Sequence, residues 1–323
     1  MSNVRVPGFL RSFDQAAWWG PHALDAEPLS VVHLIRAGTL DAELAGLLWL
    51  LLEARVPVLV AAGPRLAGKT TLLTALLEFL SPAATIHQLQ GWAEDFAWLP
   101  DAARLGWRPD GDGMPGRTRV RPGGAGVPAA TGAPMISPAT GYLVANELSP
   151  HLPFYTWGEQ ARIAIRALSL GYGLGATIHA ESLQDVFDTL RAPDVRLTDD
   201  ELSNLGVVLV LRAFRGDRGD IVRRVAAAHY VRAVSRDAGG HVQRLPPAVL
   251  ATWDQQGDTF EHFAWGVTAE LSGRIGRRPG DFEAEHARRR DVLAALAAAG
   301  VESVADVRTA IDGYRLSAAG HRH

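Results

Sequence analysis

Short apolar runs alternate with helical patterns along the middle of the chain. The runs at residues 57–62, 84–87, 142–145, 176–179 and 207–212 each predict a buried strand. Apolar residues recur at helical spacing over residues 70–79, 158–170 and 183–190. Strands that alternate with helices predict an α/β fold, in which a mostly parallel sheet is covered by helices on both faces.

The flanking regions add further elements to this pattern. Residues 31–54 predict two helices, with Thr39 or Asp41 capping the second. Residues 213–219 predict a hairpin turn that leads into a strand over 221–234. Further helices are expected near the C-terminus, over residues 260–275, 281–299 and 304–314.

We therefore expect a chain of three parts. Residues 1–28 form an N-terminal arm, residues 29–250 an α/β domain and residues 251–323 a C-terminal helical domain. Residues 109–138 are dense in glycine and proline, which cannot sustain a helix or pack a core. This segment predicts a flexible loop inside the α/β domain.

Composition excludes several classes of protein. Hydrophobic residues make up 47% of the 323 residues, charged residues 21%, and the net charge is -3, which indicates a soluble globular chain and disfavours direct nucleic-acid binding. The absence of cysteine excludes disulfides, thiolate metal sites and thiol catalysis. The most apolar stretch, residues 45–52, is far shorter than the roughly 20 residues of a membrane span. We expect no transmembrane segment, no signal peptide and a cytoplasmic location.

The chain's single lysine stands in a phosphate-loop motif. Among 32 basic residues only Lys69 is lysine, which indicates a position that needs a compact ammonium. The segment from Gly63 to Thr70 matches G-x-x-x-x-G-K-[ST] between a predicted strand and a predicted helix. In such a loop, backbone N–H groups surround the phosphates, the lysine reaches the β and γ oxygens and the hydroxyl of Thr70 contacts Mg²⁺. The alternative is a chance glycine-rich turn. The expected nucleotide-binding residues are Gly63, Pro64, Arg65, Leu66, Ala67, Gly68, Lys69, Thr70 and Thr71.

Two further candidate residues end neighbouring predicted strands. Glu147 follows the apolar run at 142–145, where a carboxylate can orient or deprotonate an attacking water. His179 ends the next strand, so both side chains should converge above the sheet near the γ-phosphate. The alternatives are a solvated glutamate and a capping or core histidine.

Several segments together resemble the type II/IV secretion ATPase superfamily, the motors of type IV pili, archaeal flagella and secretion systems. Residues 171–190, GYGLGATIHAESLQDVFDTL, resemble that family's His box. Residues 37–71 and 78–86 are similar to the segments around its phosphate loop. The C-terminal region resembles the archaeal-type branch, through Arg223-Arg224, Trp253-Asp254 and residues 288–314.

This resemblance implies a RecA-like P-loop NTPase core with ATP and Mg²⁺ as cofactors. Carried onto this chain, it makes Lys69, Glu147 and His179 the catalytic residues and Thr70 the Mg²⁺ contact. It also implies a homo-oligomer, typically a hexamer, or a hetero-oligomer with a related ATPase. The expected partner is an inner-membrane platform protein, which would place the chain in the cytoplasm or at the inner face of the cell membrane.

The chain departs from the family's pattern at several positions. Asn146 precedes Glu147 where the family usually has glycine, and the acidic box after residue 86 reads HQLQ, with Glu94 and Asp95 displaced. The family's large N-terminal domain is reduced to an arm. The arginine-bearing helix is replaced by the loop at 109–138, where the candidate substitutes are Arg117, Arg119 and Arg121.

Three functions follow as hypotheses. The first is a Mg-dependent ATP-hydrolysing motor subunit of a pilus or secretion system. The second is a nucleotide-binding regulatory or structural paralogue that assembles with an active ATPase. The third is a stand-alone P-loop kinase or DNA-translocating ATPase. The arginine run at 288–290 is interpreted as a solvated helix face.

Overall fold

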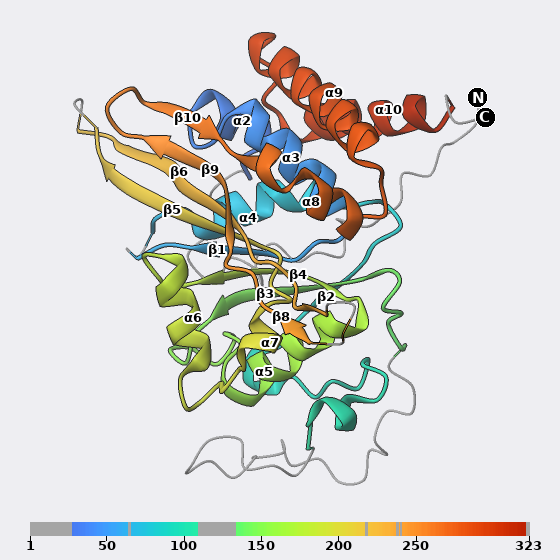
Figure 1. The fold of residues 1–323 in the computed structure, drawn as a ribbon. Helices are drawn as coiled ribbons and strands as arrows, with labels where there is room; N and C mark the ends of the chain where they lie inside the picture. The colour runs from blue at the N-terminus through green and yellow to red at the C-terminus, as the bar shows by residue number, and fades with distance from the viewer. Residues whose placement is uncertain are drawn as a thin grey trace, which may run out of the picture.

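The computed structural model describes residues 28–63, 66–108, 134–216, 219–236, 239 and 241–320. In this part of the chain, an eight-stranded sheet has the order β10-β9-β6-β5-β1-β4-β3-β2 (Figure 1). Its strands are β1 (Val58–Ala61), β2 (Thr85–Gln88), β3 (Gly141–Leu148), β4 (Gly173–Ile178), β5 (Val207–Arg215), β6 (Ile221–Tyr230), β9 (Ala248–Asp254) and β10 (Thr259–His262). A small separate ribbon pairs β7 (Ser235–Arg236) with β8 (Val242–Gln243).

Most of the sheet is parallel. Strands β5, β1, β4, β3 and β2 pair in parallel, and β6, β9 and β10 extend the sheet by antiparallel pairing. The predicted α/β fold with a mostly parallel sheet is confirmed.

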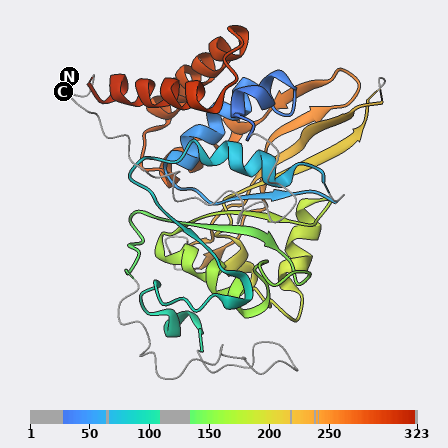
Figure 2. The same cartoon turned by 180° about the vertical axis from the view of Figure 1, so that it is seen from behind.

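Helices cover both faces of the sheet (Figures 1 and 2). One face carries α2 (Val31–Arg36), α3 (Ala42–Glu53), α4 (Lys69–Leu77), α8 (Thr268–Arg274), α9 (Pro279–Ala298) and α10 (Val304–Gly320). The other carries α5 (Gly158–Ala167), α6 (Leu183–Arg191) and α7 (Asp199–Leu202). Short 3-10 turns lie at Gly91–Ala93, Ala102–Leu105 and Leu168–Leu170.

Strand β1 shows why its sequence is an unbroken apolar run. Val58 and Val60 point into the core beneath α3 and α4, whereas Leu59 and Ala61 point into the core beneath α5 and α6. All four side chains are buried, because both faces of a central parallel strand are covered by helices.

The C-terminal helices pack on the same core as α3. A Cβ built on Gly46 of α3 would lie 2.8 Å from the backbone nitrogen of Arg290, so α3 and α9 approach closely at that glycine. Val307 and Ile311 of α10 join this core and are fully buried. The C-terminal helices expected from the sequence are therefore present, and they cover one face of the sheet.

The helix predicted over residues 260–275 is wrong in its first part. Thr259–His262 form β10, which pairs antiparallel with β9, and α8 begins only at Thr268 after a 3-10 turn at Ala264–Val267. Pairing with β9 satisfies the backbone groups of this short segment, so tertiary context decides its conformation. Strand β9 was not predicted, and it spans the expected domain boundary at residue 250.

Most of the other predicted elements agree with the structure, although β5 continues through residues 213–215, where the sequence predicts the start of the hairpin turn. Asp41, one of the two expected caps, accepts a hydrogen bond from the Leu44 N–H at 2.9 Å and begins α3. The expected N-terminal arm lies outside the described residues except for its last position, and so does most of the loop at 109–138. Of the helices that the structure describes, none combines the length and the apolar character needed to cross a bilayer.

Candidate functional site

The phosphate-loop motif lies between a strand and a helix, as its sequence predicts. Strand β1 ends at Ala61, and Gly68 adopts a left-handed conformation with φ of 95° directly before α4. No side chain caps the first turn of α4, so its N–H groups remain available to an anion. Pro64 and Arg65 lie outside the described residues.

Leu66 has the other unusual backbone in the described part of this loop. Its φ is 61°, which is rare for a residue with a Cβ, and its side chain is 90% exposed. Alternating left-handed and right-handed residues turn successive N–H groups inward and create an anion-binding concavity. In the described part of the loop, two left-handed residues, Leu66 and Gly68, thus flank Ala67 directly before α4.

Lys69 and Glu147 meet across the end of the sheet. Lys69, the first residue of α4, is 8% exposed, and its Nζ lies 3.7 Å from Oε2 of Glu147 near the end of β3. These residues are 78 positions apart in sequence, and the strand order brings them together. An ammonium and a carboxylate therefore lie side by side at the start of α4.

A β-bulge sets the position of Glu147. Ala145 pairs with Ala176 and Leu148 with Ile178, so Asn146 and Glu147 together face the single residue Thr177. The Thr177 hydroxyl donates a hydrogen bond of 2.6 Å to the Asn146 carbonyl oxygen and holds the bulge in place. Bulges of this kind redirect a side chain at the end of a strand.

His179 ends β4 at the same edge of the sheet. The Ala62 N–H donates to the Ile178 carbonyl oxygen at 3.3 Å, so the loops after β1 and β4 begin side by side. The His179 side chain is exposed, and none of the described residues hydrogen-bonds to it. The structure places His179 near the start of the phosphate loop without direct contact with Lys69 or Glu147.

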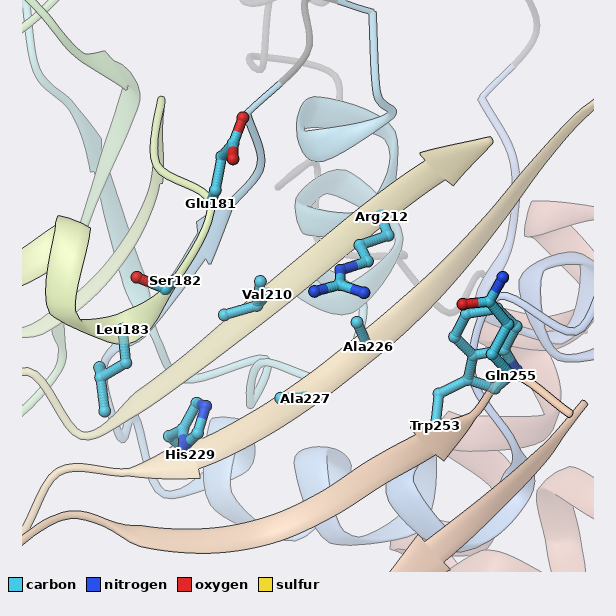
Figure 3. Close-up of a pocket in the computed structure, with 10 residues that line it drawn as sticks. All are labelled: Glu181, Ser182, Leu183, Val210, Arg212, Ala226, Ala227, His229, Trp253 and Gln255. Atoms are coloured by element: carbon cyan, nitrogen blue, oxygen red, sulfur yellow. The ribbon is translucent and has the colours of Figure 1, made fainter. Parts of the chain in front are cut away.

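Glu181 is a neighbour of the loop that sequence reasoning missed. A Cβ built on Gly63 would lie 2.5 Å from Oε1 of Glu181, so this carboxylate lies against the first glycine of the motif. Glu181 follows His179 by two residues in the same loop, and this proximity in sequence could have identified it as a candidate. Figure 3 shows Glu181 turned toward the segment that follows β1.

A cavity of about 240 Å³ adjoins this edge of the sheet (Figure 3). It lies between the start of α6 and the face of β5, β6 and β9, and Glu181 forms one of its walls. Arg212, Trp253 and the half-buried His229 also line it, and burial lowers the pKa of His229. The cavity therefore has both charged and apolar walls, and it lies beside the loop that follows β1.

The displaced acidic residues Glu94 and Asp95 both accept hydrogen bonds from the segment after β2. Glu94 is 2% exposed and accepts hydrogen bonds from the N–H groups of Gln90 and Phe96 and from the indole of Trp98. Burial alone would raise the pKa of Glu94, but contacts from His87, Gln90 and Trp98 outweigh it and lower that pKa. Asp95 accepts from the Ala97 N–H in a local turn. Both carboxylates thus hold the segment after β2 in place.

Comparison with known proteins gives distant relatives. No family model matches the chain. It is 27% identical over 217 residues to the uncharacterized protein MJ0900 of Methanocaldococcus jannaschii, an alignment that covers 67% of this chain and 36% of that protein. It is also 27% identical over 239 residues to the uncharacterized protein MJ1287 of the same organism, with 71% of this chain and 76% of that protein covered. The chain thus spans about a third of the length of the first relative and about three quarters of the second.

Proposed function

We propose that this chain binds Mg-ATP at residues 63–71 and hydrolyses it, as the motor-type subunit of a type IV pilus or a type II or type IV secretion system. The observation that carries the proposal is the meeting of Lys69 and Glu147 at the uncapped start of α4. Protein triphosphate hydrolysis uses a cation on the phosphates and a group that positions the attacking water, and Lys69 and Glu147 can supply these two groups.

The donors at the loop fit a triphosphate. The free N–H groups of the first turn of α4, the positive end of that helix and the Lys69 ammonium all favour a multiply charged anion. The Glu147 carboxylate lies beside the Lys69 ammonium, and a bound triphosphate would compete with that carboxylate for the ammonium.

Thr70 suits Mg²⁺ because its hydroxyl follows Lys69 on the first turn of α4, and the half-buried side chain is accessible from the loop. When bound, Mg²⁺ would neutralise charge that develops on the β and γ oxygens. The remaining roles belong to the protein's own side chains.

In the proposed reaction, Glu147 orients a water and accepts its proton as the water oxygen attacks the γ-phosphorus. The bond from that phosphorus to the β–γ bridging oxygen breaks, which yields ADP and phosphate. Lys69 stabilises the charge that grows on the departing oxygens. His179 directly follows β4, which lies between β1 and β3, and in this proposal it responds to loss of the γ-phosphate.

The assignment to a secretion or pilus motor depends on the resemblance of the His box and the C-terminal region. The strand order supports a RecA-like core, because β1, β3 and β4 deliver the phosphate loop, Glu147 and His179 to one edge of the sheet. ATP and Mg²⁺ as cofactors, a hexamer and an inner-membrane platform protein as partner belong to the same proposal.

Steady-state phosphate release with Mg-ATP tests the proposal. Lys69→Ala should abolish binding and turnover together, whereas Glu147→Gln should retain ATP binding and lower turnover by at least about a hundredfold. Glu283→Gln, an exposed carboxylate on α9, is the matched control and should behave as wild type. Turnover that is unchanged in Lys69→Ala or in Glu147→Gln would refute hydrolysis at this site.

One observation favours the second function, a weakly hydrolysing or non-hydrolysing paralogue that assembles with an active ATPase. Glu94 is buried and occupied by structural hydrogen bonds, so it is not available in place of the family's acidic box. The same assay separates the two functions, because the paralogue would bind ATP in a Lys69-dependent manner without releasing phosphate.

A further inference from the structure

The β5–β6 hairpin overhangs the phosphate loop. Ala61 at the end of β1 pairs with Val210, whereas the rest of β5, residues 211–215, pairs only with β6. The hairpin therefore projects past the sheet edge at which the loop begins (Figure 1). Side chains of this projection that lie on the α4 side of the sheet, among them Leu211 and Arg223, face the loop.

Arg223 contacts the loop directly. Its Nη2 donates a hydrogen bond of 3.3 Å to the Leu66 carbonyl oxygen. A Cβ built on Gly68 would lie 2.8 Å from Cδ and 3.0 Å from Nε of Arg223, so the side chain lies along the glycine that begins α4. This contact joins residues 155 positions apart in sequence.

Arg223 has unsatisfied donors. Its Nε is buried without a hydrogen-bond partner, and no carboxylate in the described part of the chain pairs with its guanidinium. The neighbouring Arg224 differs, because Nε and Nη2 bond the two oxygens of Asp258 at 2.7 and 2.8 Å and Nη1 bonds the Ala37 carbonyl. The bonds of Arg224 thus join β6 to Asp258 and Ala37. Arg223, in contrast, places a guanidinium with unsatisfied donors beside the phosphate loop.

Apart from Arg223, the described charged side chains at the loop carry one positive and two negative charges. Lys69 already has Glu147 beside it, and Glu181 adds a second carboxylate at Gly63. A triphosphate brings several negative charges to this position. A guanidinium presents donors in a planar fork that matches phosphate oxygens, and it cannot be deprotonated.

We propose that Arg223 binds the phosphates of the nucleotide held in its own subunit and so ties the β5–β6 hairpin to nucleotide occupancy. The inference depends on the proposed nucleotide site. On binding, the single long bond to the Leu66 carbonyl gives way to charge-assisted bonds from Arg223 to phosphate oxygens, and the buried Nε gains an acceptor.

The test compares Arg223→Ala and Arg223→Lys with Arg215→Ala in the full chain. Arg215 is the matched control: it is exposed, it carries the same charge, and it lies on the same face of the hairpin two residues farther from the loop. Titration calorimetry with ATP and with ADP, each with Mg²⁺, gives the dissociation constants. Melting temperatures of the nucleotide-free variants show whether they are folded.

Arg223→Ala should weaken ATP binding by about tenfold or more, with a nucleotide-free melting temperature close to that of wild type. Arg223→Lys should bind ATP more tightly than Arg223→Ala but more weakly than wild type, because lysine keeps the positive charge and lacks the planar fork of guanidinium donors. Arg215→Ala should bind as wild type.

The outcomes separate this inference from the proposed function. A wild-type chain that binds no ATP overturns both. A wild type that binds ATP in a Lys69-dependent manner, with equal affinity in Arg223→Ala, overturns the role of Arg223 and leaves the nucleotide site standing. An equal loss in Arg215→Ala also overturns it, because the effect would then be one of general charge.

Discussion

Gly68 is required at its position for two structural reasons. Its φ of 95° is strained for any residue with a Cβ, and the space where that Cβ would lie is filled by Arg223. The uncapped turn that follows depends on this conformation, because it directs the first N–H groups of α4 toward the loop. The glycine is therefore required both by backbone conformation and by close packing.

Gly68→Ala is expected to weaken ATP binding by at least about tenfold and to lower the free energy of unfolding by about 1 kcal/mol or more. Gly280→Ala is the control, since Gly280 lies in the first turn of α9 with open space around it, and alanine there should leave ATP binding unchanged and not lower the free energy of unfolding. Calorimetry and urea unfolding measure the two effects. Wild-type affinity in Gly68→Ala would show that the loop adapts without the left-handed residue.

At the scale of elements, the contact between α4 and α10 contains a buried carboxyl. Burial raises the pKa of Glu78, at the end of α4, to about 8, and the charge of Arg308 at 3.8 Å opposes this only in part. One carboxyl oxygen is buried without a hydrogen-bond partner. Because the folded-state pKa exceeds the unfolded value of 4.5, protonation stabilises the fold fully below about pH 4.5, and this stabilisation is lost as the pH rises toward 8.

Glu78→Gln should therefore gain stability relative to wild type as the pH rises from 5 to 8.5, because glutamine stays neutral. The expected change in the stability difference is on the order of a few kcal/mol. Urea unfolding of both chains at the two pH values measures it, with Glu283→Gln as the exposed control. A stability difference that is the same at both pH values would contradict the buried, protonated state of Glu78.

The contact between α3 and α9 corrects one interpretation of the sequence. The arginine run at 288–290 was expected to form a solvated helix face, but Arg289 is 3% exposed. It pairs with Glu53 and Glu285 and lies over the ring of Trp49 at 4.8 Å. A partner on another helix is needed to bury such a charge, and helical periodicity does not reveal that partner.

At the scale of the whole molecule, the proposed motor is an oligomer of several chains. The cations that the structure places at the phosphate loop, Lys69 and Arg223, come from one chain. Arg117, Arg119 and Arg121, the candidate replacements for the family's arginine helix, lie outside the described residues. In the proposed oligomer, a neighbouring subunit completes each site.

Phosphate release per subunit is therefore expected to rise with protein concentration until assembly is complete. Light scattering on the same samples reports the oligomeric state. Mixing wild type with Lys69→Ala should lower the rate by more than simple dilution, because mixed assemblies contain inactive neighbours. A constant rate per subunit across monomeric and assembled samples would exclude sites shared between subunits.

Much of the fold could be predicted from local patterns. The strand–loop–helix unit around Lys69 and the elements between residues 141 and 212 follow from apolar runs, helical spacing and glycines close to each other in sequence. Strands β9 and β10 were missed because their conformation depends on pairing with β6 and with each other. The pattern of Thr259–His262 alone does not distinguish a strand from the start of a helix.

The sequence by itself determined the phosphate-loop motif, the single lysine within it and the alternation of strands and helices, because all of these are local properties of the chain. Only the tertiary structure decided which distant side chains surround that loop. The bulge at Asn146 and Glu147 requires β4 as a neighbour, and the contacts of Glu181 with Gly63 and of Arg223 with Gly68 require a particular strand order and hairpin projection. Those contacts join residues far apart in sequence, and no local periodicity encodes the order in which strands pair.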